Sequence, residues 1–167
     1  MNGAQALVKC LELEGITKIF GYPGVAIAPF YDAMYASSID HILVRQEQAA
    51  GHAASGYARI SGRPAVCCTS SGPGATNLIT ALATAYADSI PLIAITGQVA
   101  TPLLGHDVFQ EADMRGSTQS FVKYSYLVKN ADDIPRIVRE AFYIASSGRK
   151  GPVLIDLPCD VQMADLR

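Results

Sequence analysis

The chain has 167 residues, of which 50% are hydrophobic and 17% are charged, a composition that suits one compact domain rather than two domains or a disordered tail. Thirteen Lys and Arg residues against fifteen Asp and Glu residues give a net charge of −2, without a basic run that could neutralise nucleic-acid phosphates. No apolar stretch reaches the ~18 residues that a bilayer crossing requires. We therefore expect a cytoplasmic protein that binds neither nucleic acid nor a membrane.

The first half of the chain alternates between segments with helical hydrophobic spacing and short apolar segments typical of strands. Apolar residues at helical spacing, with Asn2 as a cap and Gly15 as a stop, predict a helix over 3–14. A strand through residues 18–20 and a turn at 21–24 then lead to a helix through 27–34. The pattern continues with a strand at 41–44, a helix at 46–60, a strand at 65–69, a helix at 74–87 and a strand at 91–96.

A long loop interrupts this alternation from Gly97 to about residue 120, and loops of this kind often carry function. A strand at 126–128 follows, then a helix that Asp132 or Asp133 caps and Gly148 ends, and a last strand at 152–157. Continuous apolar strands that alternate with helices predict a doubly wound α/β domain. Its mainly parallel sheet is expected to carry helices on both faces.

The cysteines and histidines show no pattern of a metal site. The four cysteines include no CxxC pair, and Cys67 and Cys68 are adjacent in an apolar run, where a shared disulfide is geometrically awkward. The three histidines lack neighbours suited to zinc. We expect reduced, buried thiols and no metal held by these residues.

Four segments that directly follow predicted strands are candidate sites, because parallel strands point their carboxyl ends at the ligand crevice. These segments are 21–26, 45–59, 69–77 and 97–111. The first alone indicates only a tight turn. The third is rich in glycine, but it lacks the lysine of a P-loop, and Asn77 stands where the dinucleotide fingerprint has its third glycine.

The helix in the second segment carries Glu47 in its first turn, and Gly51, Ala54 and Ala58 share its face. Glycine inside a helix costs about 1 kcal/mol relative to alanine, so another backbone is expected to approach closely. Two interpretations stay open for this face. Either the helix packs tightly inside the domain and Glu47 complements the helix dipole, or the face is a contact with a ligand or a second subunit.

Six short motifs then occur in a fixed order along nearly the whole chain. They are GYPG at 21–24, RQEQ at 45–48 with GYAR at 56–59, SGPGATN at 71–77, ITGQV at 95–99, DVFQE at 107–111 and GPVLIDLP at 151–158. In this order they resemble the pyrimidine-binding (Pyr) domain of thiamine-diphosphate enzymes, most closely the acetolactate synthase (acetohydroxyacid synthase) large subunit. The resemblance implies one flavodoxin-like Pyr domain over residues 1–167.

The resemblance gives Glu47 a catalytic role: it hydrogen-bonds N1′ of the aminopyrimidine of thiamine diphosphate and favours the imino tautomer, which acts as a base. It implies decarboxylation of pyruvate and condensation of the product with a second 2-ketoacid, a reaction of branched-chain amino acid biosynthesis. Because this carboxylate must work in a dry site, we expect the small-residue face beside it to lie in a subunit contact, and we expect a dimer through the helix that contains Gly51 and Ala54.

The resemblance also assigns other residues. It places Tyr22, Pro23, Gly24, Ser71, Gly72 and Asn77 around the cofactor, and Val25, Phe109 and Gln110 toward the substrate. Four positions depart from the family's pattern: glycine is common where Val25 stands, proline where Ala100 stands, threonine where His106 stands and lysine where Cys159 stands.

The motifs absent from the chain complete this interpretation. The family binds Mg²⁺ on a separate PP domain and FAD mostly on a middle domain, and neither domain is represented in this sequence. The resemblance thus implies part of a longer enzyme that is a homodimer or tetramer, with a small regulatory subunit as a further partner. We expect the chain alone to be inactive. The alternatives are another thiamine-diphosphate decarboxylase or acetyltransferase acting on 2-ketoacids or acyl-CoA, or a non-catalytic, flavodoxin-like nucleotide-binding module.

Overall fold

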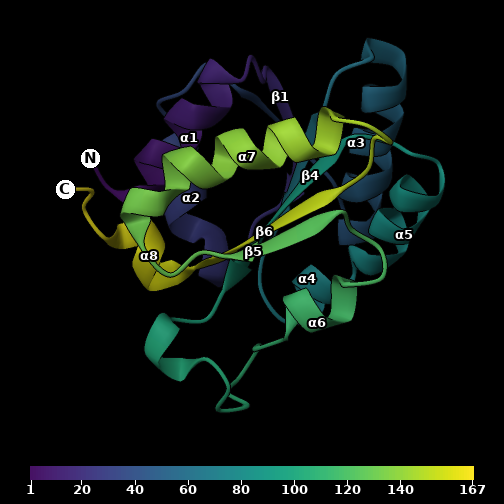
Figure 1. Cartoon of the computed structure of the whole chain (residues 1–167). Coiled ribbons are helices and arrows are strands. Elements are labelled where there is room, and N and C mark those ends of the chain that lie inside the picture. The colour runs from purple at the N-terminus through teal and green to yellow at the C-terminus, as the bar shows by residue number, and fades with distance from the viewer.

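A computed structural model describes all 167 residues and contains one six-stranded sheet, with strand order β2-β1-β3-β4-β6-β5 (Figure 1). Every strand pairing is parallel. The strands are β1 (Lys18–Tyr22), β2 (Asp40–Leu43), β3 (Ala65–Thr69), β4 (Leu92–Gln98), β5 (Tyr124–Leu127) and β6 (Val153–Pro158). The predicted doubly wound α/β fold is confirmed.

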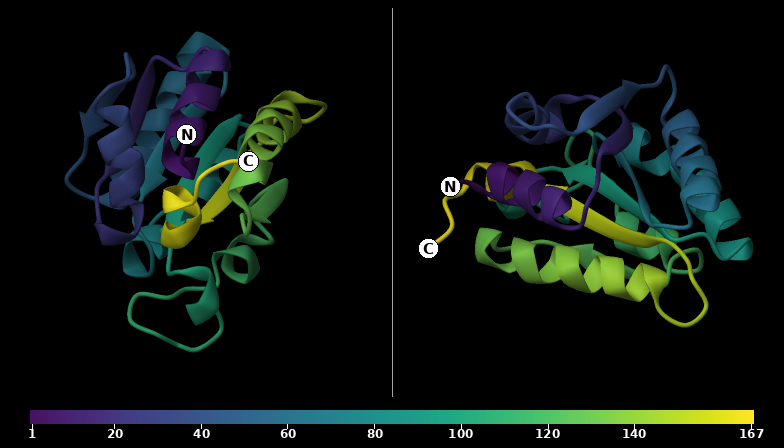
Figure 2. Two further views of the ribbon diagram at one scale, coloured as in Figure 1. Left: turned by 90° about the vertical axis from the view of Figure 1, so that its left-hand side faces the viewer. Right: turned by 90° about the horizontal axis from the view of Figure 1, so that it is seen from above.

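Helices cover both faces of the sheet. They are α1 (Gly3–Leu13), α2 (Ala28–Met34), α3 (Glu47–Ser61), α4 (Pro73–Thr76), α5 (Ile79–Ala87), α6 (Met114–Thr118), α7 (Ile134–Ser146) and α8 (Cys159–Met163), with short 3-10 turns η1 (Val25–Ile27), η2 (Thr101–Leu103) and η3 (Ala131–Asp133). Helices α1 and α7 lie side by side on one face (Figure 2). No helix is both long enough and apolar enough for a membrane span.

The alternation of side chains along each strand produces two hydrophobic cores. In β3, Val66 and Cys68 belong to the core beneath α1, α2 and α7, whereas Cys67 belongs to the core beneath α3 and α5. Both faces of the central strands are therefore buried, which explains why these strands read as continuous apolar runs.

Local side-chain chemistry sets the ends of the predicted helices. The Asn2 side chain accepts a hydrogen bond from the Gln5 amide at 2.9 Å, and the Gln5 side chain accepts one from the Asn2 amide at 3.1 Å, forming a capping box. Gly15 and Gly62 follow α1 and α3 in the left-handed region, with φ of +75° and +69°. The predicted start and stop of the first helix are confirmed.

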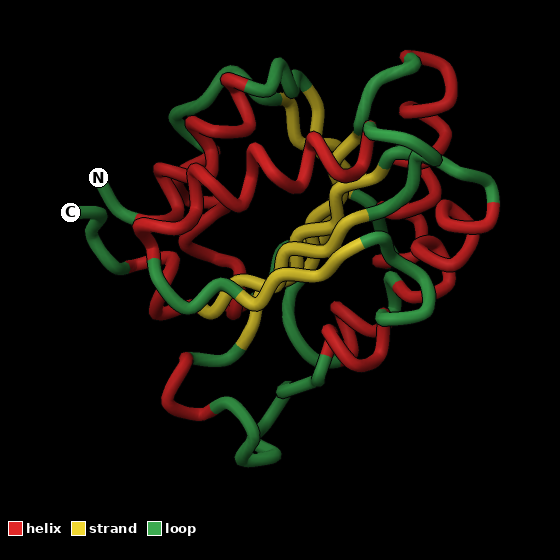
Figure 3. The backbone as a smooth tube through the Cα atoms, viewed as in Figure 1, coloured by secondary structure: helices red, strands yellow, loops and turns green.

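Several short elements differ from the prediction. The helix expected at 74–87 is divided into α4 and α5, and the loop expected up to residue 120 contains η2 and α6 (Figure 3). Asp133 is the N-cap residue of α7, as predicted, but its side chain makes no capping hydrogen bond. Asn130 instead caps the preceding η3, by accepting from the Asp132 amide at 3.2 Å. Helix α8 was not predicted. Helices of four or five residues are too short to show a period, so no pattern indicates them.

The order of the strands fixes where a ligand can approach. The chain leaves β1 on one side to form β2, then crosses back over β1 to form β3. The segments that follow β1 and β3 therefore run in opposite directions at the carboxyl edge of the sheet, which opens a crevice at this switch point.

Candidate functional site

An open pocket of about 310 Å³ lies at the switch point, within the size range of small-molecule sites. Its walls come from the segments that follow β1, β2 and β3 and from the long loop after β4. The lining residues are Tyr22, Pro23, Gly24, Val25, Glu47, Ser70, Ser71, Pro73, Gly74, Asn77 and Gln110.

Glu47 supplies the only charged group of this lining. It is the first residue of α3, where the helix dipole favours a negative charge. Its Oε2 atom accepts a hydrogen bond from Asn77 Nδ2 at 3.0 Å, and no hydrogen bond within the chain occupies Oε1. A Cβ atom on Gly74 would stand 3.5 Å from Oε1, so the lack of a side chain there keeps this oxygen accessible. The site holds a carboxylate with one fixed oxygen and one free oxygen.

The end of β1 and the turn that follows it both require glycine. A Cβ atom on Gly21 would stand 2.5 Å from the Cys68 carbonyl oxygen, and one on Gly24 would stand 2.4 Å from Ser70 Cβ. The end of β1 therefore packs directly on β3, and the turn after β1 packs on the segment that follows β3. Val25, at the rim of the pocket, has 87% of its side chain exposed.

The long loop after β4 reaches the pocket through a backbone contact. Gly72 has φ of +56°, and a Cβ atom there would stand 2.8 Å from the Gln110 Cα atom. Within the loop, Glu111 accepts hydrogen bonds from the Gly105 amide at 2.5 Å and the Val108 amide at 3.2 Å, and these bonds lower the pKa of Glu111. The loop is thus held closed on itself, with Gln110 beside the pocket.

A buried acid anchors the end of this loop. The Thr96 hydroxyl donates to Asp156 Oδ1 at 2.6 Å, and Gln98 Nε2 donates both to Asp156 Oδ2 at 2.9 Å and to the Ala112 carbonyl at 2.8 Å. Burial raises the pKa of Asp156 to about 7, although both hydrogen bonds oppose this shift. Gln98 of β4 and Asp156 of β6 thereby fix Ala112, which follows the loop.

The structure brings most of the predicted site residues together. Of these residues, Tyr22, Pro23, Gly24, Val25, Glu47, Ser71, Asn77 and Gln110 line one pocket. Gly72 lies behind the wall against Gln110, and Phe109 is outside the lining with 87% of its side chain exposed. The prediction missed Ser70, Pro73 and Gly74, which the motif at 69–77 could have indicated.

The expectation that the small-residue face of α3 lies in a subunit contact is wrong, whereas a dimer through another face of this helix stays a prediction. Gly51 and Ala54 are both buried within the chain itself, and a Cβ atom on Gly51 would stand 2.4 Å from the Ala81 Cβ atom of α5. The small-residue face of α3 therefore serves close packing against α5 inside the domain, and the outward face of α3 contains different residues.

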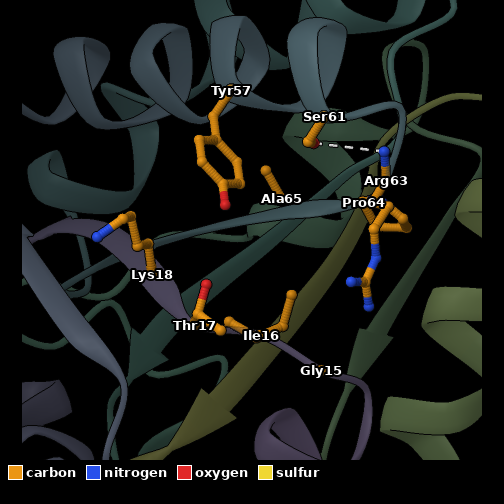
Figure 4. Close-up of a pocket in the computed structure, with 9 residues that line it drawn as sticks. All are labelled: Gly15, Ile16, Thr17, Lys18, Tyr57, Ser61, Arg63, Pro64 and Ala65. Atoms are coloured by element: carbon orange, nitrogen blue, oxygen red, sulfur yellow. Dashed lines mark hydrogen bonds between the residues drawn. The ribbon is translucent and has the colours of Figure 1, made fainter.

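A second hollow, of about 70 Å³, lies at the amino ends of β1 and β3, opposite the candidate site (Figure 4). Its cations already have partners: Lys18 pairs with Asp40 at 2.7 Å, and Arg63 donates to the Glu14 carbonyl at 3.3 Å. It is far smaller than the sites that small-molecule ligands usually occupy, so it offers no competing ligand site.

The cysteines are free thiols. Cys67 and Cys68 are buried, and burial raises the pKa of the Cys67 thiol to about 12. Cys10 and Cys159 are partly exposed, so the expectation that all four are buried is wrong for these two. No group of three or more His, Cys, Asp and Glu side chains has the arrangement of a metal site.

The amino-acid sequence of the chain matches a known protein family. Residues 1–117 match the family model described as the thiamine pyrophosphate enzyme, N-terminal TPP binding domain. The chain belongs to this family. The matched residues include the segments after β1, β2 and β3 and the loop up to Glu111, so the pocket lies wholly within the TPP binding domain of the family.

Relatives of this TPP binding domain extend over almost the entire chain. This chain is 57% identical over 166 residues to a probable acetolactate synthase large subunit of Methanocaldococcus jannaschii. It is 54% identical over 164 residues to the acetolactate synthase isozyme 2 large subunit of Escherichia coli. An acetolactate synthase large subunit of Mycobacterium tuberculosis is 56% identical over 162 residues. The matches cover 96–99% of this chain but only 26–30% of these relatives.

Proposed function

We propose that this chain is the Pyr part of an acetolactate synthase, with Glu47 as its catalytic residue. The observation that carries the proposal is the carboxylate of Glu47, which presents a free oxygen to a pocket at the switch point of a TPP binding domain. The named relatives support acetolactate synthesis as the reaction.

The pocket residues fit an aminopyrimidine ring. One Glu47 oxygen is held by Asn77, which leaves the other available to a ring nitrogen, and the lack of a side chain at Gly74 keeps that oxygen open. The remaining lining is mostly small or apolar, as a flat heterocycle requires. Tyr22, Pro23, Gly24 and Ser71 would enclose the ring, and Gly72 would hold the wall behind it.

When bound, thiamine diphosphate supplies the electron sink that allows pyruvate to lose carbon dioxide and the remainder to join a second 2-ketoacid. The residues of this chain bind and orient the cofactor. Glu47 would share a proton with the ring nitrogen, and Asn77 would keep the carboxylate pointing into the pocket. Val25, Phe109 and Gln110 would face the substrates.

The longer enzyme would supply the other components. Because the chain spans only 26–30% of these relatives, we propose that Mg²⁺ and FAD bind outside these residues. The names of the relatives include the words large subunit, which supports a small regulatory subunit as a partner. A second copy of the chain would contact the outward face of α3, where Ala53 and Ile60 are exposed.

The replacement Glu47→Gln in the complete enzyme tests this function. It keeps the shape of the side chain but removes the negative charge, so we expect acetolactate formation from pyruvate to fall by roughly 100-fold or more. Glu14→Gln, at the opposite end of the sheet, is the matched control and should leave the rate unchanged. Full activity of Glu47→Gln, or a product other than an acetohydroxyacid, would overturn the proposal.

A further inference from the structure

Gln162 is a buried amide in α8 that lies outside the pocket lining. Its side chain is 0% exposed, yet all its hydrogen-bonding atoms have partners. The Nε2 atom donates to the Ala26 carbonyl at 2.8 Å and to the Leu157 carbonyl at 3.0 Å, and the Oε1 atom accepts from the Phe30 amide at 3.3 Å. One side chain therefore joins the end of β6 to the segment that follows β1.

These bonds hold η1, the short turn between the pocket and α2. Ala26 lies within η1 and Phe30 within α2, and α8 packs against α2 (Figure 1). The Ala26 carbonyl also lies against β4, because a Cβ atom on Gly97 would stand 2.6 Å from its oxygen. The turn is thus confined between the backbone of β4 and the amide of Gln162.

Two pocket residues lie at the start of this turn: Gly24 directly precedes η1, and Val25 is its first residue. The Ile27 amide donates to the Gly24 carbonyl at 3.1 Å, so a displacement of Ala26 is passed to Gly24 through one turn of backbone. Without Gln162, the Ala26 and Leu157 carbonyls and the Phe30 amide would each lose a hydrogen bond, and lost hydrogen bonds of buried polar groups are costly. The turn would then shift to regain hydrogen bonds.

We propose that Gln162 is a positioning residue of the candidate site, which fixes the Gly24–Ile27 turn at the rim of the pocket. The role rests on the proposed function only in so far as this turn encloses the cofactor. The contacts of Gln162 with the turn belong to the chain itself and can be tested without a ligand.

Gln162→Met preserves volume and removes every hydrogen bond of this side chain. Val138→Ala, in α7 and buried in the same core, is the control, because it weakens packing without touching the turn. By hydrogen exchange of the 167-residue chain, we expect the Ile27 and Phe30 amides to exchange at least about tenfold faster in Gln162→Met than in Val138→Ala, compared at equal overall stability.

In the complete enzyme, Gln162→Met should raise the thiamine diphosphate concentration for half-maximal activity by about tenfold, with a smaller change in kcat, whereas Val138→Ala should leave this concentration unchanged. Gly97→Ala displaces the same carbonyl from the opposite side. It should therefore reproduce the effect and remain informative if Gln162→Met does not fold, and the double variant should be less than additive.

Equal exchange rates of the Ile27 and Phe30 amides in Gln162→Met and Val138→Ala would overturn the proposal. An unchanged thiamine diphosphate requirement in both Gln162→Met and Gly97→Ala would also overturn it. Failure of the proposed function would be visible separately, as full activity of Glu47→Gln. The exchange result would then still decide whether Gln162 fixes the turn.

Discussion

Two acidic side chains near the carboxyl edge of the sheet lie in opposite surroundings. Asp156 is the only acid that the fold buries, and donors from Thr96 and Gln98 occupy both of its oxygens. Glu47 is half-buried and keeps one oxygen free toward an open pocket. Asp156 is therefore a structural acid, whereas Glu47 is the acid that a ligand can reach.

The stability of the chain should depend on pH through Asp156. Burial raises the pKa of this group to about 7 from an ordinary value of 3.8, so between these values the folded chain holds a proton that the unfolded chain has lost. The free energy of unfolding should therefore fall as pH rises through this window and become level above it. Urea unfolding at several pH values from about 4 to about 8 measures this.

Asp156→Asn is the control for that measurement, because its amide can donate to Thr96 and accept from Gln98 without titrating. The difference in unfolding free energy between parent and variant isolates the contribution of this one group. A difference that does not change with pH would contradict the assignment.

Individual residues differ in how well the sequence predicts them. Glu47 and Asn77 lie in recognisable motifs that directly follow predicted strands, so their place at one edge of the sheet could be anticipated. Gln162 could not, because its bond to Ala26 spans 136 residues and depends on a helix too short to show a period. Side-chain contacts of this kind become visible only with the tertiary structure.

In helix α3, the interpretation of the small-residue pattern differs most from the contacts that the structure shows. Its interior glycines, Gly51 and Gly56, lie on different faces because they are five residues apart. Gly51 is packed against Ala81 of α5, whereas nothing lies within 4 Å of a Cβ atom on Gly56. The pattern correctly indicated a close approach, but helical spacing alone could not show whether the approaching backbone belonged to the same chain.

The two glycines should respond oppositely to alanine. Gly56→Ala gains helix propensity in open space and should stabilise the chain by about 0.5–1 kcal/mol. Gly51→Ala gains the same propensity but forces α3 away from α5, and overpacking of this kind costs roughly 1–3 kcal/mol. Urea unfolding of dilute protein checks both. Stabilisation by Gly51→Ala would show that α3 and α5 can move apart at little energetic cost.

The strands and the longer helices were predicted, whereas the helices of four or five residues were not. Strands β3, β4 and β6 are buried on both faces, so their apolar runs identify them directly. Helices α4 and α6 arise from glycine conformations and side-chain caps. For example, Asp113 Oδ1 accepts a hydrogen bond from the Gly116 amide at 3.0 Å. Such caps depend on the fold around them as much as on local sequence.

At the scale of the whole molecule, one topological feature assembles the site. Three strands that are adjacent in the sheet deliver their following segments to one edge, and the loop after β4 closes on them through Gly72 and Gln110. The pocket nevertheless stays open on one side, and Phe109 and Val25 remain largely exposed beside it. Further protein could therefore cover this edge in an assembly.

Self-association should use the outward face of α3, which is exposed and poor in charge. Ala53→Arg places a large cation in the middle of this face and should convert a dimer at high concentration into a monomer, as measured by sedimentation velocity. Ala36→Arg, an equally exposed alanine away from α3, should leave the dimer intact. A parent chain that stays monomeric, or a dimer that tolerates Ala53→Arg, would exclude this face as the contact.

A crystal structure of the complete enzyme with thiamine diphosphate bound would test the role of Glu47 most directly. We predict a carboxylate oxygen of Glu47 at hydrogen-bonding distance, about 2.6–3.2 Å, from a nitrogen of the aminopyrimidine ring, with Asn77 still on the other oxygen. An aminopyrimidine bound elsewhere, with the Glu47 carboxylate left in contact with solvent, would show that Glu47 does not bind the cofactor ring.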